Sequence, residues 1–275
     1  MPRILDYNGR DVDRSVTVAS IVAQRNAPQP LSQVTAGTAE EAAAAEAAGI
    51  EMVVCLSDNV AAVREGSSRL FVTAAIDFSG AVSDDDLLGT AYTALQSGAD
   101  AVITARRFAS IRRIADEDIP VMGHLGFVPK KSTLYGGVRA VGKTAAEATA
   151  LWDQFRRLED AGAFAVECEL IPARVMREIR QRTRLVTISL GSGRDADVIF
   201  LFTSDICGES ARQPRHAKAY GDLAALRARA QAERIEALAA FRAEVLGGHY
   251  PADEHVAAIE DEELAAFVAR LRRQD

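Results

Sequence analysis

The sequence predicts an α/β protein folded as a (β/α)8 TIM barrel, with an extra N-terminal arm and C-terminal helices. Short apolar runs, typical of buried parallel strands, alternate with longer segments that have helical periodicity and capping residues. A chain of 275 residues is long enough for one large barrel. Right-handed crossovers between parallel strands would close the sheet. An open doubly wound sheet is the alternative.

The predicted elements follow this alternation along the chain. Residues 1–16 are polar and form a predicted arm, residues 17–258 form the barrel, and residues 259–275 form an additional C-terminal segment. The predicted strands are 31–36, 52–56, 71–76, 101–105, 119–124, 163–169 and 185–190. The predicted helices, several opened by a capping Thr or Ser and closed by Gly, are 16–27, 38–49, 83–98, 144–162, 172–183, 222–248 and 259–273.

Charge and cysteine content narrow the class of protein. The formal net charge is −7, which argues against nucleic-acid and anionic-membrane partners, because both select basic surfaces. Cys55, Cys168 and Cys207 are not closely paired, so we expect reduced thiols. The N-terminus has no apolar signal core and no run approaches the length of a membrane span. We therefore expect a cytoplasmic protein.

Two predicted strands carry titratable side chains at their carboxyl ends. An apolar run leads into His124, which is flanked by Gly123 and Gly126. His124 would therefore lie at the carboxyl end of its strand, where ligands bind in α/β proteins. A packed, hydrogen-bonded core histidine is the alternative. Strand alternation points Glu167 and Glu169 to one side, with Cys168 opposite. Because isolated buried carboxylates are costly, at least one of them should face a polar cavity or a partner.

An ordered set of motifs over roughly residues 17 to 258 resembles the ketopantoate hydroxymethyltransferase family of the phosphoenolpyruvate/pyruvate barrel superfamily. The motifs are Gly123-His-Leu-Gly126 with Pro129, Tyr135-Gly-Gly with Gly142-Lys143, Glu169-Leu-Ile-Pro172, Gly191-Ser-Gly193, Pro214-Arg-His-Ala-Lys218 and Tyr250-Pro-Ala-Asp-Glu-His255. The resemblance implies a small 2-oxo acid substrate, Mg2+, methylene-tetrahydrofolate as co-substrate and a homo-oligomer, in the family a pentamer-based ring.

The resemblance also implies roles for individual residues. Glu169 aligns with the base that removes the proton beside the carbonyl, and His124 aligns with the histidine that contacts the keto acid. Losing that proton at neutral pH requires stabilisation of the enolate oxygen, and a base with a raised pKa suits the step. Glu167 matches no family position, and a salt-bridged residue at the rim is its simplest interpretation.

The expected substrate and metal ligands depart from the family pattern. Where the family has Val-Gly-Asp-Ser, this chain has Cys55-Leu-Ser57-Asp58, with the two functional types in swapped order. Asp77 lies two residues beyond the expected second aspartate, and Arg106 and Arg107 replace the lysine and glutamate of the fourth strand.

Two interpretations of these departures follow. In one, Asp58 and Asp77 hold Mg2+, Ser57 and Asp58 contact substrate, and Arg106 or Arg107 anchors the substrate carboxylate. In the other, the metal is lost and cationic side chains bear the enolate charge, or no enolate forms.

Four hypotheses of function follow from this pattern. The first is an aldol or lyase-type enzyme, forming or cleaving C–C bonds with one-carbon transfer, whose 2-oxo acid substrate has changed. The second is the 3-methyl-2-oxobutanoate hydroxymethyltransferase of pantothenate biosynthesis itself. The third is lyase chemistry on a carbon–carbon or carbon–phosphorus bond. The fourth is a non-catalytic paralogue that binds a small acid or scaffolds an assembly.

Overall fold

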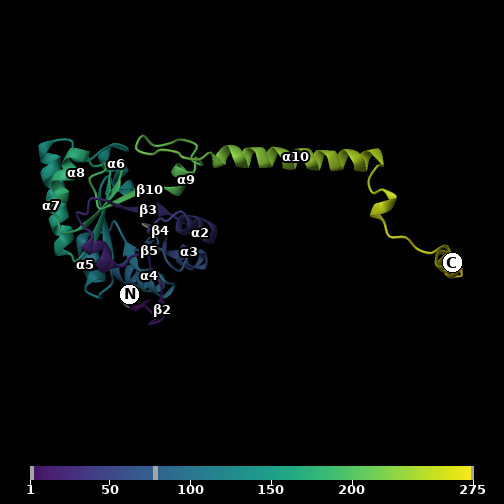
Figure 1. Cartoon of the computed structure of the whole chain (residues 1–275), viewed down its shortest axis with the longest axis horizontal. Coiled ribbons are helices and arrows are strands. Elements are labelled where there is room, and N and C mark those ends of the chain that lie inside the picture. The colour runs from purple at the N-terminus through teal and green to yellow at the C-terminus, as the bar shows by residue number, and fades with distance from the viewer. Residues whose placement is uncertain (1–2, 77–79, 274–275) are drawn as a thin grey trace. The chain divides into compact units, whose positions relative to one another are not determined.

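The chain forms a closed barrel of eight parallel strands surrounded by helices, as the sequence predicts (Figure 1). The computed structural model describes residues 3–76 and 80–273, which fall into two compact units, 1–221 and 222–275. The barrel strands are β3 (Leu31–Thr35), β4 (Met52–Leu56), β5 (Phe71–Ala75), β6 (Ala101–Ile103), β7 (Val121–Gly126), β8 (Ala165–Glu169), β9 (Val186–Leu190) and β10 (Val198–Leu201). They follow one another in this order, and β10 pairs with β3 to close the barrel.

Strand alternation divides the barrel core into an inner and an outer layer. Inward-facing side chains such as Met52, Phe71 and Ile188 fill the barrel interior. Outward-facing side chains such as Val53 and Val166 pack against the surrounding helices. The interior is therefore a packed core rather than a pore, and a ligand must bind at the carboxyl ends of the strands.

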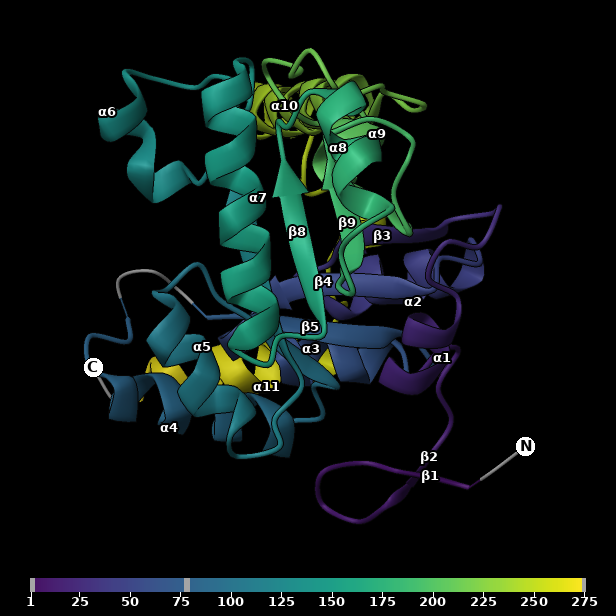
Figure 2. The same ribbon diagram turned by 90° about the vertical axis from the view of Figure 1, so that its left-hand side faces the viewer.

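Helices cover the outside of the strands, with α7 and α8 beside β8 and β9 (Figure 2). Several begin where the sequence places a cap; Thr38, Ser83 and Thr144 each accept a backbone N–H three residues on. The described helices of this unit are α1 (Val18–Ala23), α2 (Ala39–Ala47), α3 (Val60–Gly66), α4 (Asp84–Gln96), α5 (Phe108–Ala115), α6 (Ser132–Tyr135), α7 (Ala145–Asp160), α8 (Ala173–Arg180) and α9 (Thr203–Ile206).

Among the described strands and α-helices, seven were not predicted from the sequence: β1 (Ile4–Leu5), β2 (Asp11–Val12), β10, α3, α5, α6 and α9. The eighth strand β10 has only four residues, too short for a periodic signal, and it follows a polar turn. The helices α3 and α5 are also short. The arm contains a two-stranded antiparallel pair, β1 with β2, rather than an unstructured polar segment.

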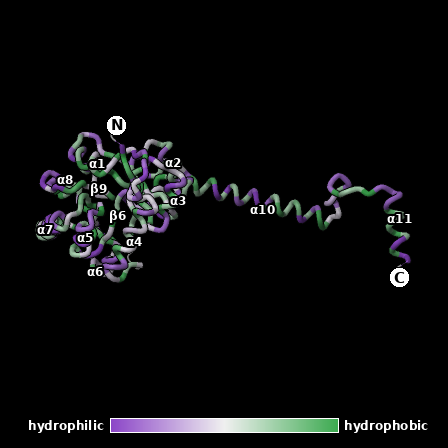
Figure 3. Tube along the Cα trace, turned by 90° about the horizontal axis from the view of Figure 1, so that it is seen from below, coloured by the Kyte–Doolittle hydropathy of each residue, from purple (hydrophilic) through white to green (hydrophobic). Residues whose placement is uncertain are grey.

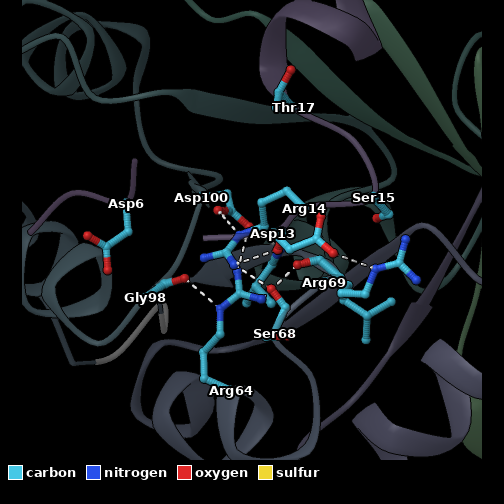
Figure 4. Close-up of polar contacts among 12 residues, drawn as sticks. Asp6, Asp13, Arg14, Ser15, Thr17, Arg64, Ser68, Arg69, Gly98 and Asp100 are labelled. Atoms are coloured by element: carbon cyan, nitrogen blue, oxygen red, sulfur yellow. Dashed lines mark hydrogen bonds and ion pairs between the residues drawn. The ribbon is translucent and has the colours of Figure 1, made fainter. Parts of the chain in front are cut away.

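A buried ion-pair network attaches the arm to the amino-terminal side of the barrel (Figure 4). The Asp100 carboxylate accepts from Arg14 Nε at 2.7 Å and from Arg64 at 2.6 Å. The side chains of Arg14 and Asp100 are only 4% and 17% exposed. The same carboxylate accepts the backbone N–H of Val72 at 2.8 Å. Asp100 thus provides a counter-charge that is shared by two buried guanidinium groups, and it bonds strand β5 directly.

The second unit consists mainly of two helices, α10 (Leu223–Gly247) and α11 (Asp261–Leu271). No residue of α10 is buried, and apolar and polar residues alternate along its trace (Figure 3). Both helices were predicted. The predicted domain boundaries after residues 16 and 258 stay predictions. Among the described residues, no helix combines the length and the apolar character needed to span a bilayer.

Replacing Asp100 by Asn should lower the free energy of unfolding by about 3 kcal/mol, because two buried guanidinium groups would lose their counter-charge. Urea denaturation followed by circular dichroism measures this change. The control is Glu178→Gln, which breaks an exposed pair with Arg182 and should cost less than about 0.5 kcal/mol. Equal effects of the two substitutions would contradict a structural role for the network.

Candidate active site

His124 and Glu169 meet at the carboxyl ends of the adjacent strands β7 and β8. His124 Nε2 lies 3.0 Å from Glu169 Oε2 and 3.1 Å from the carbonyl oxygen of Phe127. A carbonyl oxygen only accepts hydrogen bonds, so Nε2 carries the hydrogen and donates it to both oxygens. Their side chains are 9% and 13% exposed. The imidazole is thereby held with a fixed orientation against the Glu169 carboxylate.

Gly126 allows β7 to end directly against the last residue of β8. Its φ is +88°, and a Cβ there would lie 2.2 Å from the carbonyl oxygen of Glu169. That carbonyl accepts the N–H of Phe127 at 2.8 Å. The residue after Glu169, Leu170, also has a positive φ of 51°. The close approach of the two strand ends keeps Glu169 within hydrogen-bonding distance of His124.

Glu167 adds a second carboxylate to the same face, as strand alternation predicts. Glu167 is paired in register with His124, and its Oε1 lies 3.8 Å from His124 Nε2. Its side chain is 9% exposed. Cys168 points the opposite way, into the outer layer of the core. The interpretation of Glu167 as a salt-bridged rim residue is wrong in its location, because Glu167 is buried beside His124 and Glu169.

Burial and charge shift the pKa values of this cluster. Burial raises the pKa of Glu167, the positive charge of His124 opposes the shift, and the Glu169 charge adds to it. For His124, burial favours the neutral ring. The hydrogen bond to Glu169 and the charges of Glu167 and Glu169 outweigh burial and raise the His124 pKa. Both shifts favour the protonated forms of Glu167 and His124 relative to their ordinary pKa values.

The side chains of His124, Glu167 and Glu169 line a cavity of about 560 Å3 at the carboxyl ends of the barrel strands, which we call the mouth of the barrel. Its walls are largely apolar, with Ile103 and Phe200 among them. Thr104 also lines it, and its buried hydroxyl has no hydrogen-bond partner among the described residues. No Lys or Arg belongs to the described lining, so His124 is its only described basic side chain. The cavity suits a small ligand with an apolar part.

Arg106 and Arg107 do not line the mouth. They line a neighbouring hollow that shares Ala105 and His124 with it. Arg107 pairs with Asp84 at 2.8 Å, and Arg106 donates to the carbonyl oxygen of Val82 at 2.7 Å.

Ser57 and Asp58 also lie away from His124 and Glu169. They form a short turn after β4 and line a separate hollow beside α4. The side chain of Asn59, the third residue of the turn, lines the mouth instead. Asp77 lies outside the described residues. The predicted pairing of Asp58 with Asp77 at a metal site therefore stays a prediction.

One described cluster has donors suited to a metal ion. His124, Glu167 and Glu169 each offer a ligand atom, and these atoms lie within 4.8 Å of one another. A nitrogen and two carboxylate oxygens suit a divalent cation, although imidazole favours transition metals over Mg2+. The residues of the mouth therefore fit a divalent cation.

Comparison with known proteins agrees with this geometry. The family model described as ketopantoate hydroxymethyltransferase matches residues 56–253, which include β7 and β8. The chain belongs to the ketopantoate hydroxymethyltransferase family. The resemblance drawn from the sequence motifs is thus confirmed.

Named relatives and solved structures extend this result. The chain is 37% identical to the 3-methyl-2-oxobutanoate hydroxymethyltransferase of Pyrobaculum islandicum, over 70% of this chain and 73% of that protein. It is 30% identical to the enzyme of that name from Thermobifida fusca, over 90% and 95%. The phosphoenolpyruvate phosphomutase of Streptomyces platensis subsp. rosaceus shares the fold, with TM-score 0.50 and 14% identity over 94% of this chain and 99% of that chain.

Sequence reasoning located part of the site of this ketopantoate hydroxymethyltransferase family member. It identified His124 and Glu169, and strand alternation placed Glu167 beside them. It missed Asn59, Thr104 and Phe202, which also line the mouth. Thr104 lies near the carboxyl end of the predicted strand 101–105, which is the signal that could have identified it. No disulfide joins the three cysteines, and burial raises the pKa of Cys55 to about 11.

Replacing Glu167 by Gln should flatten the pH dependence of stability. The pKa of Glu167 in the folded protein lies above its ordinary value of 4.5, so the folded state binds more protons than the unfolded state in that window. Stability therefore falls as the pH rises above 4.5. The raised His124 pKa acts in the same direction above its ordinary value of 6.5.

Urea denaturation at pH 5 and pH 8 tests this expectation. The free energy of unfolding should decrease more between these pH values in the wild type than in Glu167→Gln. Parallel decreases in the two proteins would show that Glu167 does not keep its proton in the folded state. Glu178→Gln, an exposed substitution, serves as the control and should follow the wild type.

Proposed function

We propose that this protein is an enzyme that transfers a one-carbon unit to a small 2-oxo acid, with Glu169 as the base and His124 as its partner. The observation that carries the proposal is the 3.0 Å contact between these two side chains at the mouth of the barrel. Both occupy the positions that the family motifs assign to the base and to the histidine contacting the keto acid. The relatives named 3-methyl-2-oxobutanoate hydroxymethyltransferase support this class of substrate.

The proposed reaction begins with removal of the proton beside the carbonyl. The C–H bond breaks, the proton passes to a Glu169 carboxylate oxygen, and the electron pair is delocalised onto the keto oxygen. A protonated His124 supplies positive charge in a largely apolar cavity, where it stabilises the enolate more than it would in water. Water releases the one-carbon unit of methylene-tetrahydrofolate, the proposed co-substrate, as formaldehyde, which breaks both of its C–N bonds. The enolate carbon then forms a C–C bond to the formaldehyde carbon, and the carbonyl electron pair passes to the formaldehyde oxygen, which takes a proton to give the hydroxymethyl group.

The proposal includes a divalent cation such as Mg2+, held by other residues than the Asp58 and Asp77 predicted from the sequence. The residues that would hold it in the described mouth are His124, Glu167 and Glu169. Binding would require a neutral His124 and an ionised Glu167, and the bound cation would then supply positive charge to the keto oxygen in place of a protonated His124. Ser57 and Asp58 as substrate ligands, and Asp58 and Asp77 as metal ligands, stay predictions from the sequence.

The identity of the acid has two candidates. The described mouth lining contains no Lys or Arg to anchor a carboxylate, which favours a substrate different from that of the named relatives. Arg106 or Arg107 could bind the substrate carboxylate only from the neighbouring hollow. The named relatives favour 3-methyl-2-oxobutanoate itself.

A cytoplasmic location and a homo-oligomer, including a pentamer-based ring, are also part of the proposal.

Deuterium exchange tests the first step without requiring the co-substrate. In D2O, the wild-type protein should exchange the C3 proton of 3-methyl-2-oxobutanoate, followed by proton NMR with and without Mg2+. Glu169→Gln should slow the exchange by about 10³-fold, because it removes the general base. Glu178→Gln, which lies outside the mouth, should exchange like the wild type.

Each outcome of this experiment distinguishes between the candidates. Exchange of 3-methyl-2-oxobutanoate supports the substrate of the named relatives, whereas exchange of only pyruvate or 2-oxobutanoate supports a changed substrate. Failure to exchange any of the three acids, under both metal conditions, would contradict the proposed enolisation and support a non-catalytic paralogue.

A further inference from the structure

A second hollow, of about 810 Å3, adjoins the mouth of the barrel. It lies between the start of α5, the segment leading into α6, and one face of α7. Figure 2 shows α5 and α6 on the same side of α7. The linings of the hollow and the mouth share Ala105 and His124. A ligand long enough could therefore occupy both.

Cationic side chains dominate this hollow. We call it the cationic groove, after the five basic residues Arg106, Arg107, Lys130, Lys131 and Arg157 that line it. Asp153 is the only acidic residue in its described lining. The partner of Arg107, Asp84, does not belong to that lining and offsets one of the five charges. The groove thus carries a net positive charge in a protein whose formal net charge is −7.

Several of these cations are held in place and crowded together. The Arg157 guanidinium lies 4.6 Å from the centre of the Phe108 ring, and the Val82 carbonyl holds Arg106. Burial, followed by the charges of Arg106 and Lys131, lowers the pKa of Lys130. An anion bound among these groups would relieve their mutual repulsion.

We propose that the cationic groove binds the extended, polyanionic part of a ligand whose other end reaches the mouth. The cations come from three separate parts of the chain, the β6–α5 loop, the segment 129–131 and α7, and they line one hollow of about 810 Å3, which has room for an extended ligand. Carboxylates and phosphates both match arginine forks. The inference rests on the proposed function for the role of the mouth, but its test does not require turnover.

Two small probes distinguish the possible anionic groups. Tri-γ-glutamate carries a chain of carboxylates, and inorganic tripolyphosphate carries a chain of phosphates. Isothermal titration calorimetry of the full-length protein at low salt should detect binding of at least one probe, weakening as salt is added. Tighter binding of triglutamate assigns the groove to a polycarboxylate ligand, and tighter binding of tripolyphosphate assigns it to a polyphosphate ligand.

Neighbouring residues provide matched controls for the variants. Arg157→Ala and Lys131→Ala should each weaken binding about threefold, and the double variant about tenfold, as expected for partly exposed ion pairs. Arg156→Ala, the next residue on α7, and Lys143→Ala should bind like the wild type, because neither lines the groove. Equal losses in the groove and control variants would identify nonspecific attraction and overturn the proposal, as would no binding of either probe.

The variant Glu169→Gln separates this inference from the proposed function. It should lose enolisation yet bind the preferred probe with wild-type affinity, because Glu169 does not line the groove. If the wild type binds a probe but fails to exchange any keto acid, the proposal for the groove is supported and the proposed reaction is contradicted. If exchange occurs but no probe binds, the reaction stands and the groove proposal fails.

Discussion

The close approach of β7 and β8 at Gly126 is the constraint on which the candidate site depends. Only a residue without a Cβ fits there, because the Glu169 carbonyl occupies the space. This contact brings the ends of two neighbouring strands together and thereby sets the distance between His124 and Glu169. A pair of side chains built on a strand register is more rigid than one carried on loops, and such rigidity suits the proposed role of Glu169 as a base.

The same register creates an electrostatic problem that the site must solve. It places Glu167 beside the pair, so two carboxylates share one imidazole in a buried position. One proton on Glu167, or a divalent cation among the three groups, balances these charges. Glu167 lies outside the motifs that carry the resemblance to the family. The two solutions predict different dependence of the chemistry on metal ions, and so the extra carboxylate has direct consequences for mechanism.

The sequence was sufficient for the barrel and for the paired strands because their signals are local. Apolar runs, caps and strand alternation predicted seven of the eight strands and the common face of Glu167 and Glu169. The sequence was insufficient to predict where the side chains of Asp58, Arg106 and Arg107 point, because their directions depend on how the chain turns after a strand. A 3-10 turn directs Asp58 away from the mouth. Arg107 has an extended backbone just before α5, and its side chain pairs with Asp84. Alignment by residue type cannot detect such rotations.

The Arg14–Asp100 pair also bears on the order in which the chain is made. These partners are 86 residues apart, so the arm leaves the ribosome long before its counter-charge exists. Until Asp100 has been synthesised, Arg14 must stay hydrated, since burying it alone would be costly. Docking of the arm therefore reports that the first three strands of the barrel, β3 to β5, have been translated.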